Sequence, residues 1–283
     1  KNITGLELKV EPKIAHKAVK DLELKKKKLE ELYGNINTFK LSKSLDNEYS
    51  INGNKVKLNT SVYWYQPKNE MCMWYSSGIM PGNYVFSKDV IDISQWDTYR
   101  KYWDKGYTSM KHEKFVCPGI KLNNNENLLL TTQYSSKQFG VSPREIWSIQ
   151  STINNENNKI CSVYSMDIQV NKKYLTKGHV LGKVLTLSKF TALTDDEIKT
   201  LKLPTKLTTN NSTNNDEQKE QKNNNNDNES EIDIEWCKFE CLMQINLGGW
   251  LPSAAVNFAI AGNLMTTYDD MRKYILKQQY NIK

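Results

Sequence analysis

The stretch from Asp233 to Tyr274 constrains the fold of this chain more than any other segment. From Glu235 onward, apolar side chains alternate with charged or amide side chains, which is the period of a half-buried β-strand. The apolar positions are Cys237, Phe239, Cys241, Met243, Ile245 and Leu247, and the positions between them include Lys238, Glu240 and Gln244. We therefore expect a strand with one apolar face.

A helix is expected to follow this strand. Gly248 and Gly249 allow the backbone to reverse, and Pro252 suits a first helical turn, where no backbone N–H is needed. Apolar side chains then recur every three or four residues, at Val256, Ile260, Leu264, Tyr268, Met271 and Ile275. On patterning alone, this is a core helix that packs against an antiparallel sheet.

The residues upstream supply that sheet. Periodicity and turn residues predict helices at Pro12–Tyr33 and Asp89–Asp104, with Gly34 ending the first. They predict strands at Val56–Tyr65, Met71–Ser77, Leu128–Tyr134, Glu145–Ile153, Ile160–Val170 and Val180–Phe190. The fold class is therefore α+β, with a curved antiparallel sheet of about nine strands.

Composition gives the expected domain organisation. Residues 1–34 form an N-terminal helical extension, and residues 35–283 form one domain. Pro204–Ser230 is rich in Asn, Thr, Lys, Glu and Gln, so we expect a disordered insertion at 205–231. Such Asn- and Lys-rich inserts resemble those of protozoan parasite proteins, which is an analogy about origin alone.

Charge and cysteine content narrow the functional classes. The net charge of +7 suits phosphates or anionic lipid and is not diagnostic of nucleic acid. The Lys25–Lys28 run is a solvated helix face or, less favoured, a membrane or nucleic-acid contact. The 5 cysteines have no disulfide-framework spacing and are expected in the core. The apolar run near Val256–Met265 is too short to span a bilayer, so we expect a soluble protein. We also expect it to be a monomer.

The sequence gives little support for catalysis. His16, His112 and His179 lack metal-binding spacing, and the sequence holds neither a Gly-x-Ser-x-Gly elbow nor a phosphate-binding glycine loop. We therefore expect no catalytic residue, no metal and no cofactor. The chain starts without Met, so we expect a trimmed or processed segment whose native compartment is left open, a secreted or exported parasite protein included.

Three motifs together resemble those of START (StAR-related lipid transfer) domains. Gln244–Pro252 resembles the Asp-x-Gly-Gly-Trp-x-Pro-like turn before the family's last helix, with Asn246 in place of the acid. Tyr99–Asp104 resembles Tyr-Arg-Lys-x-Trp-Asp, and Pro143–Ile149 resembles an Asn-Arg-Asp-aromatic strand opening. They occur in the family's order across most of residues 60 to 276 once the insertion is set aside. The resemblance implies a helix-grip fold, in which the sheet wraps around the C-terminal helix and encloses a lipid tunnel.

The resemblance also implies a function and a site. The protein would bind a phospholipid and move it between membranes through transient surface contact. Phosphatidylcholine is the favoured ligand, because the Tyr99–Asp104 segment resembles the phosphatidylcholine-transfer branch of the family. Arg100 would hold the lipid phosphate with Asp104 as support, whereas a surface i,i+4 ion pair is the plain alternative. The expected tunnel and lid residues are Tyr99, Trp103, Trp147, Phe239, Met243, Val256, Ile260, Leu264, Met265 and Tyr268.

Two further expectations concern the headgroup and the membrane. Gln133 occupies the position of a cage Trp in the phosphatidylcholine branch, so headgroup selectivity should be relaxed. A loop with Lys173, Tyr174, Leu175 and Lys177 suits docking on an anionic membrane, although loops often expose such side chains without a role. Two other functions stay open, a lipid sensor or partner-binding module without transfer, and a helix-grip cavity enzyme.

Overall fold

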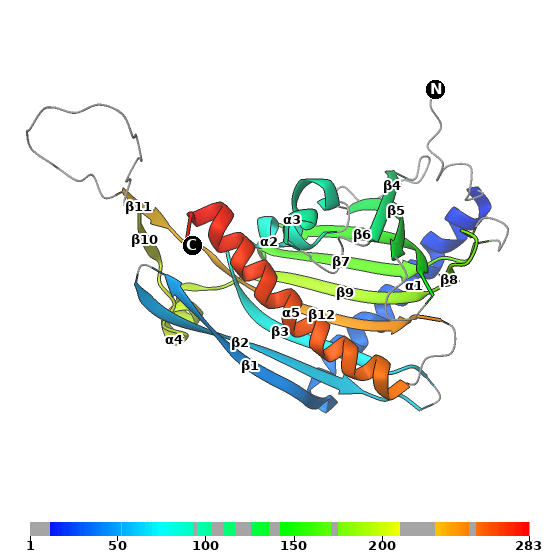
Figure 1. Cartoon of the computed structure of the whole chain (residues 1–283), viewed down its shortest axis with the longest axis horizontal. Coiled ribbons are helices and arrows are strands. Elements are labelled where there is room, and N and C mark those ends of the chain that lie inside the picture. The colour runs from blue at the N-terminus through cyan, green and yellow to red at the C-terminus, as the bar shows by residue number, and fades with distance from the viewer. Residues whose placement is uncertain are drawn as a thin grey trace, which may run out of the picture.

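The computed structural model describes residues 12–51, 53–68, 70–92, 95–103, 110–116, 126–135, 142–170, 175–209, 230–248 and 253–282. A long, curved antiparallel sheet forms the centre, and the last helix crosses one face of it (Figure 1). The first helix lies on the other face, so the sheet is a layer between two helices. No helix in this described part of the chain is long and apolar enough to cross a membrane.

The sheet brings distant parts of the chain together. Its order is β1 (Lys40–Ile51), β2 (Asn54–Tyr65), β3 (Met73–Pro81), β12 (Trp236–Asn246), β9 (Lys183–Ala192), β7 (Ile160–Asp167), β6 (Arg144–Asn155), β5 (Glu126–Ser135) and β4 (Met110–Val116). Neighbours on this path pair antiparallel, and β8 (Val180–Leu181) adds a short parallel pair to β6. The predicted last strand, β12, therefore lies in the middle of the sheet, between β3 and β9.

The helices sit on both faces of this sheet. They are α1 (Pro12–Gly34), α2 (Tyr84–Ile91), α3 (Lys101–Trp103), α4 (Asp195–Thr200) and α5 (Ser253–Tyr280), with short turns η1 (Ile36–Thr38) and η3 (Trp96–Arg100). α2 and α5 lie on the same face of the sheet (Figure 1), which we call the concave face. Their buried side chains belong to one apolar cluster. α1 packs on the opposite face through Ala18, Leu22 and Leu29.

Strand alternation separates the two faces. Phe239 and Cys241 of β12 belong to the α5-side core, whereas Leu242 belongs to the α1-side core. The α+β prediction is confirmed, as are the strands predicted from Val56 to Phe190 and the last strand and helix. In the large sheet, two strands were missed, β1 and β4. β1 is an edge strand whose first seven residues are all exposed, so it lacks the apolar alternation that identifies a strand.

The predicted helix at Asp89–Asp104 is wrong in its extent. α2 begins earlier, at Tyr84, because the Asn83 side chain accepts a hydrogen bond from the Val85 N–H at 2.8 Å. It ends at Ile91, because the extended backbone of the next residue, Asp92 (φ −60°, ψ 122°), takes the chain out of the helix. Residues 96–103 then form a separate π turn and a short α turn.

The polar face of β12 is also less exposed than the sequence suggested. Glu240 is only 4% exposed because α1 covers it. Its carboxylate accepts hydrogen bonds from the Tyr33 hydroxyl at 2.7 Å and from Tyr75, and it pairs with Lys238 at 2.8 Å. Burial acts to raise the pKa of Glu240, but these three partners bring it below its usual value. The buried charge is therefore satisfied.

The predicted insertion at 205–231 is narrower than its composition indicated. Lys206–Thr209 forms β10 and pairs with Ser230–Asp233, which forms β11. Leu207 is buried in the α5-side core, so this hairpin is attached to the domain. Residues 210–229 lie outside the described part of the chain.

Replacement of residues 210–229 by an Asn-Gly turn should leave the fold intact, because Thr209 and Ser230 are already paired across the hairpin. We expect the melting temperature to shift by about 3 °C or less. Deletion of residues 206–230 also removes Leu207 and should lower it by about 5–10 °C. Equal melting curves for the two deletions would show that β10 adds no stability.

Candidate functional site

A cavity of about 280 Å³ lies between the concave face of the sheet and the N-terminal half of α5. Strands β6, β7, β9 and β12 supply its floor through their inward-facing positions, and α5 supplies its roof. The floor includes Ile146, Val163, Val184, Phe239, Met243 and Ile245, and the roof includes Ile260, Asn263, Leu264, Thr267 and Tyr268. The walls are thus mostly apolar, with short hydroxyl and amide side chains between them.

Three stacked aromatic rings close one side of the cavity. The rings of Phe190 and Phe239 are parallel at 4.5 Å between centroids, and Tyr268 stacks on Phe239 at 4.8 Å. The Tyr268 hydroxyl donates to the Phe239 carbonyl at 2.9 Å, which fixes the ring on the strand. Phe239 and Tyr268 line the cavity, but the faces that they turn toward each other are covered.

One end of the cavity is charged. Arg100 is buried there and donates from Nη1 to the Ile91 carbonyl at 2.7 Å, while its guanidinium carbon lies 5.6 Å from the centre of the Trp103 ring. Asp92 lies at the same end and accepts a hydrogen bond from the Gln150 amide at 2.8 Å. A guanidinium, a carboxylate and an amide therefore border one end of an otherwise apolar space.

The structure brings six of the predicted site residues together around this cavity. They are Arg100, Phe239, Met243, Ile260, Leu264 and Tyr268. Tyr99 and Trp103 support the charged end without lining it. Tyr99 packs edge-on against Phe86 at 5.5 Å, and the Trp103 indole N–H donates to the Val90 carbonyl at 2.9 Å.

The other predicted residues lie elsewhere. Trp147 is buried in the α1-side core, because the alternation of β6 turns Ile146 and Ser148 toward the opposite face. Met265 packs against Val62 and Trp74 beside the cavity. Asp104 and the side chain of Val256 lie outside the described residues.

The predicted membrane loop is described only in part. Lys173 and Tyr174 lie outside the described residues, whereas Lys177 is exposed. Leu175 is half-buried against the α1-side core, and the neighbouring Thr176 N–H donates to the Glu145 carboxylate at 2.8 Å. This end of the loop is therefore anchored to β6.

Sequence reasoning missed Asp92 and Gln150, because no motif marks them. Asp92 was placed inside a predicted helix and Gln150 inside a strand, and only the fold sets them side by side.

The cavity lining also includes Cys241, whose thiol pKa is raised to about 11 by burial. A thiol with this pKa is neutral at physiological pH and a weak nucleophile. Among the described residues, no three His, Cys, Asp or Glu side chains are grouped as metal ligands.

Arg272 and Gly78 hold α5 over the cavity. The β2–β3 pairing ends at Thr60 and Gly78, and the strands separate beyond that point. The fully buried Arg272 fills the gap and donates to the carbonyls of Ile79 at 2.8 Å, Asn59 at 2.8 Å and Leu58 at 3.3 Å. A Cβ at Gly78 would lie 2.7 Å from the Tyr268 ring, so glycine lets the helix approach the strand this closely.

The sequence matches no protein-family model and no curated protein. Solved structures nevertheless share this architecture. Human StAR-related lipid transfer protein 5 superposes with a TM-score of 0.60 at 14% identity, over 93% of this chain and 99% of that chain. The chain has the START fold. Human STARD10 gives a TM-score of 0.53 at 12% identity, over 89% of this chain and 79% of that one. The START fold thus accounts for nearly the whole chain.

Arg272→Met should destabilise the START fold strongly, because it removes a fully buried cation that donates hydrogen bonds to three strand carbonyls. We expect the free energy of unfolding in urea to fall by about 3–5 kcal/mol. Lys273→Met is the matched control: Lys273 is exposed and pairs with Asp269 on the surface, so its loss should cost about 0.5 kcal/mol. Similar losses for both variants would contradict an anchoring role for Arg272.

Proposed function

We propose that this protein binds one lipid molecule between the sheet and α5 and carries it between membranes. The observation that supports this most directly is the composition of the cavity, with a long apolar wall and one charged end at Arg100. An amphiphilic lipid is divided in the same way, into a long apolar part and a polar or charged end. The START fold supports the proposal further, since a structure named for lipid transfer matches along 99% of its length.

In this proposal, the favourable free energy of binding comes from burial of the acyl chain in the cavity. Each methylene buried in the cavity contributes about 0.8 kcal/mol, which offsets extraction from the bilayer. A volume of about 280 Å³ is small even for a drug-sized ligand, whose sites begin near 300 Å³. A lipid with two acyl chains therefore requires α5 to move outward, and α5 would act as the gate.

We further propose a phospholipid ligand, phosphatidylcholine among others, with relaxed headgroup selectivity. Arg100 supplies a planar donor suited to a phosphate, which every phospholipid carries. Recognition of choline instead needs open aromatic faces. Among the described residues, the cavity lining has two aromatic side chains, Phe239 and Tyr268. They are stacked on each other, so they offer little of such a cage. The described residues therefore favour phosphate recognition over choline recognition.

Leu264→Trp should reduce lipid transfer between vesicles severalfold, because the larger side chain fills a cavity that is already small. Thr266→Trp is the matched control, since Thr266 lies on the exposed face of the same helix. Fluorescent-lipid transfer and thermal melting should be measured for both. Full transfer by folded Leu264→Trp would place the ligand outside this cavity and overturn the proposal.

Arg100→Glu should weaken phospholipid binding by about 10–100-fold, because a charge-assisted hydrogen bond is replaced by repulsion. Arg100→Lys should lose less, since a point charge cannot reproduce the planar fork. Lys101→Glu, an exposed neighbour with the same charge change, should bind like the parent protein. The assay should include phosphatidylcholine, phosphatidylinositol and phosphatidylserine.

We expect all three lipids to be bound and all three to depend on Arg100. Strict choline selectivity would contradict relaxed recognition. Undiminished binding by Arg100→Glu would show that Arg100 has only a structural role at the end of the cavity.

A further inference from the structure

A second and larger cavity, of about 630 Å³, lies on the opposite face of the sheet. We call it the outer groove. One wall is a stripe of α1 that includes Ile14, Ala18, Asp21, Leu24 and Lys25, spaced at three or four residues as on one helix face. The floor comes from β7, β9 and β12, through Met166, Leu185 and Gln244.

The sheet separates this groove from the inner cavity. Met166 and Leu185 face the outer groove, whereas their chain neighbours Ser165, Val184 and Thr186 face the inner cavity. A molecule in the outer groove therefore contacts a different set of side chains, and the two cavities can be blocked independently.

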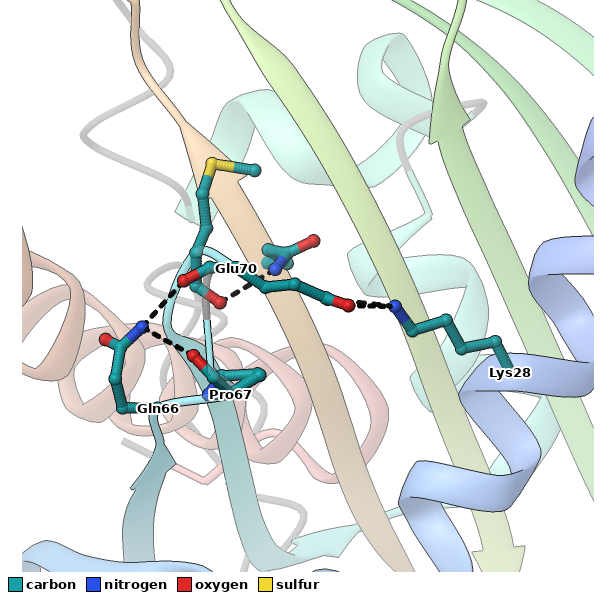
Figure 2. Close-up of polar contacts among 6 residues, drawn as sticks. Lys28, Gln66, Pro67 and Glu70 are labelled. Atoms are coloured by element: carbon teal, nitrogen blue, oxygen red, sulfur yellow. Dashed lines mark hydrogen bonds and ion pairs between the residues drawn. The ribbon is translucent and has the colours of Figure 1, made fainter.

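The rim of the groove exposes apolar side chains and is held in place. Leu24 is 67% exposed and Met71 is 37% exposed, and both line the groove. Figure 2 shows the contacts of the loop before Met71. The Glu70 carboxylate pairs with Lys28 of α1 at 2.8 Å, and the Gln66 side-chain amide donates to the Glu70 carbonyl at 2.6 Å. The Met71 carbonyl accepts from Gln244 at 2.8 Å. This wall is preformed rather than dependent on a ligand.

The charges in the groove favour an anion. Among the described residues, three lysines (Lys17, Lys25 and Lys183) and two aspartates (Asp21 and Asp167) line it, which gives this part of the lining one net positive charge. Lys17 and Asp21 pair with each other at 3.0 Å. Burial raises the pKa of Asp167, and the nearby Lys183 and Lys25 act in the opposite direction. The excess positive charge therefore lies at Lys25 and Lys183.

We propose that the outer groove binds a single-chain amphiphile with one negative charge, such as a fatty acid. Its chain lies against the exposed Leu24 and Met71, above the buried Met166 and Leu185, and this removes the apolar surface of Leu24 and Met71 from water. Its carboxylate is held by Lys25 and Lys183. A single charge on the ligand balances the net charge of the lining, and the volume lies within the range of small-molecule sites.

The test uses dansylated undecanoic acid, kept below its micelle concentration, and follows its fluorescence during titration of the full chain. The double variant Lys25→Glu, Lys183→Glu should bind it about tenfold more weakly or worse. The matched control is Lys20→Glu, Lys27→Glu, which changes the net charge equally at two exposed lysines outside the groove. Leu264→Trp blocks the inner cavity only, so it should bind the probe like the parent protein.

The uncharged methyl ester of the probe gives a second readout. It should bind more weakly than the acid and should respond little to Lys25→Glu, Lys183→Glu. Loss of probe binding in Leu264→Trp alone would place the probe in the inner cavity and overturn the inference, while leaving the proposed lipid function intact. Equal losses in the two double variants would overturn it as well, since they indicate attraction by net charge alone. The inference would also be overturned if the parent protein did not bind the probe.

Discussion

The contact on which this structure depends most is the one between Arg272 and the gap in the sheet. β2 and β3 separate after Thr60 and Gly78, and the guanidinium of Arg272 lies in the gap between them. From α5, this one group donates to three strand carbonyls, those of Leu58, Asn59 and Ile79. Burial lowers the pKa of Arg272, while Tyr49 and Asp269 act to raise it, and a guanidinium remains charged under these conditions. The helix is thereby fixed to the sheet at one defined point.

The cavity follows from this attachment. From Met271 onward, α5 is packed closely through Met271, Ile275, Leu276 and Tyr280. The cavity lies on the other side of the attachment, beneath Ile260 and Leu264. An opening motion that pivots at Tyr268 and Arg272 could widen the cavity without disturbing the main core. This division between an anchored half and a covering half is what a carrier of an apolar ligand requires.

Much of this fold could be predicted because its central elements are strongly periodic. β12 alternates and α5 repeats at helical spacing, so both were found from the sequence. Arg100 was singled out by its place in a motif and lies at the end of the cavity, and its role there stays a prediction. Glu240 was read as solvent-facing because its burial depends on α1, more than 200 residues earlier in the chain. Asp92 and Gln150 meet 58 residues apart through the fold alone. β1 was missed because an exposed edge strand carries no apolar pattern.

Both faces of the sheet carry a cavity, and the central claim concerns the inner one: the transferred lipid lies between β12 and α5. Photo-crosslinking tests this directly, with a phosphatidylcholine that carries a diazirine in one acyl chain and with peptide mapping of the labelled protein. The account predicts labels on Phe239–Ile245 of β12 and Ile260–Tyr268 of α5. Labels confined to α1, or to no single part of the chain, would contradict it.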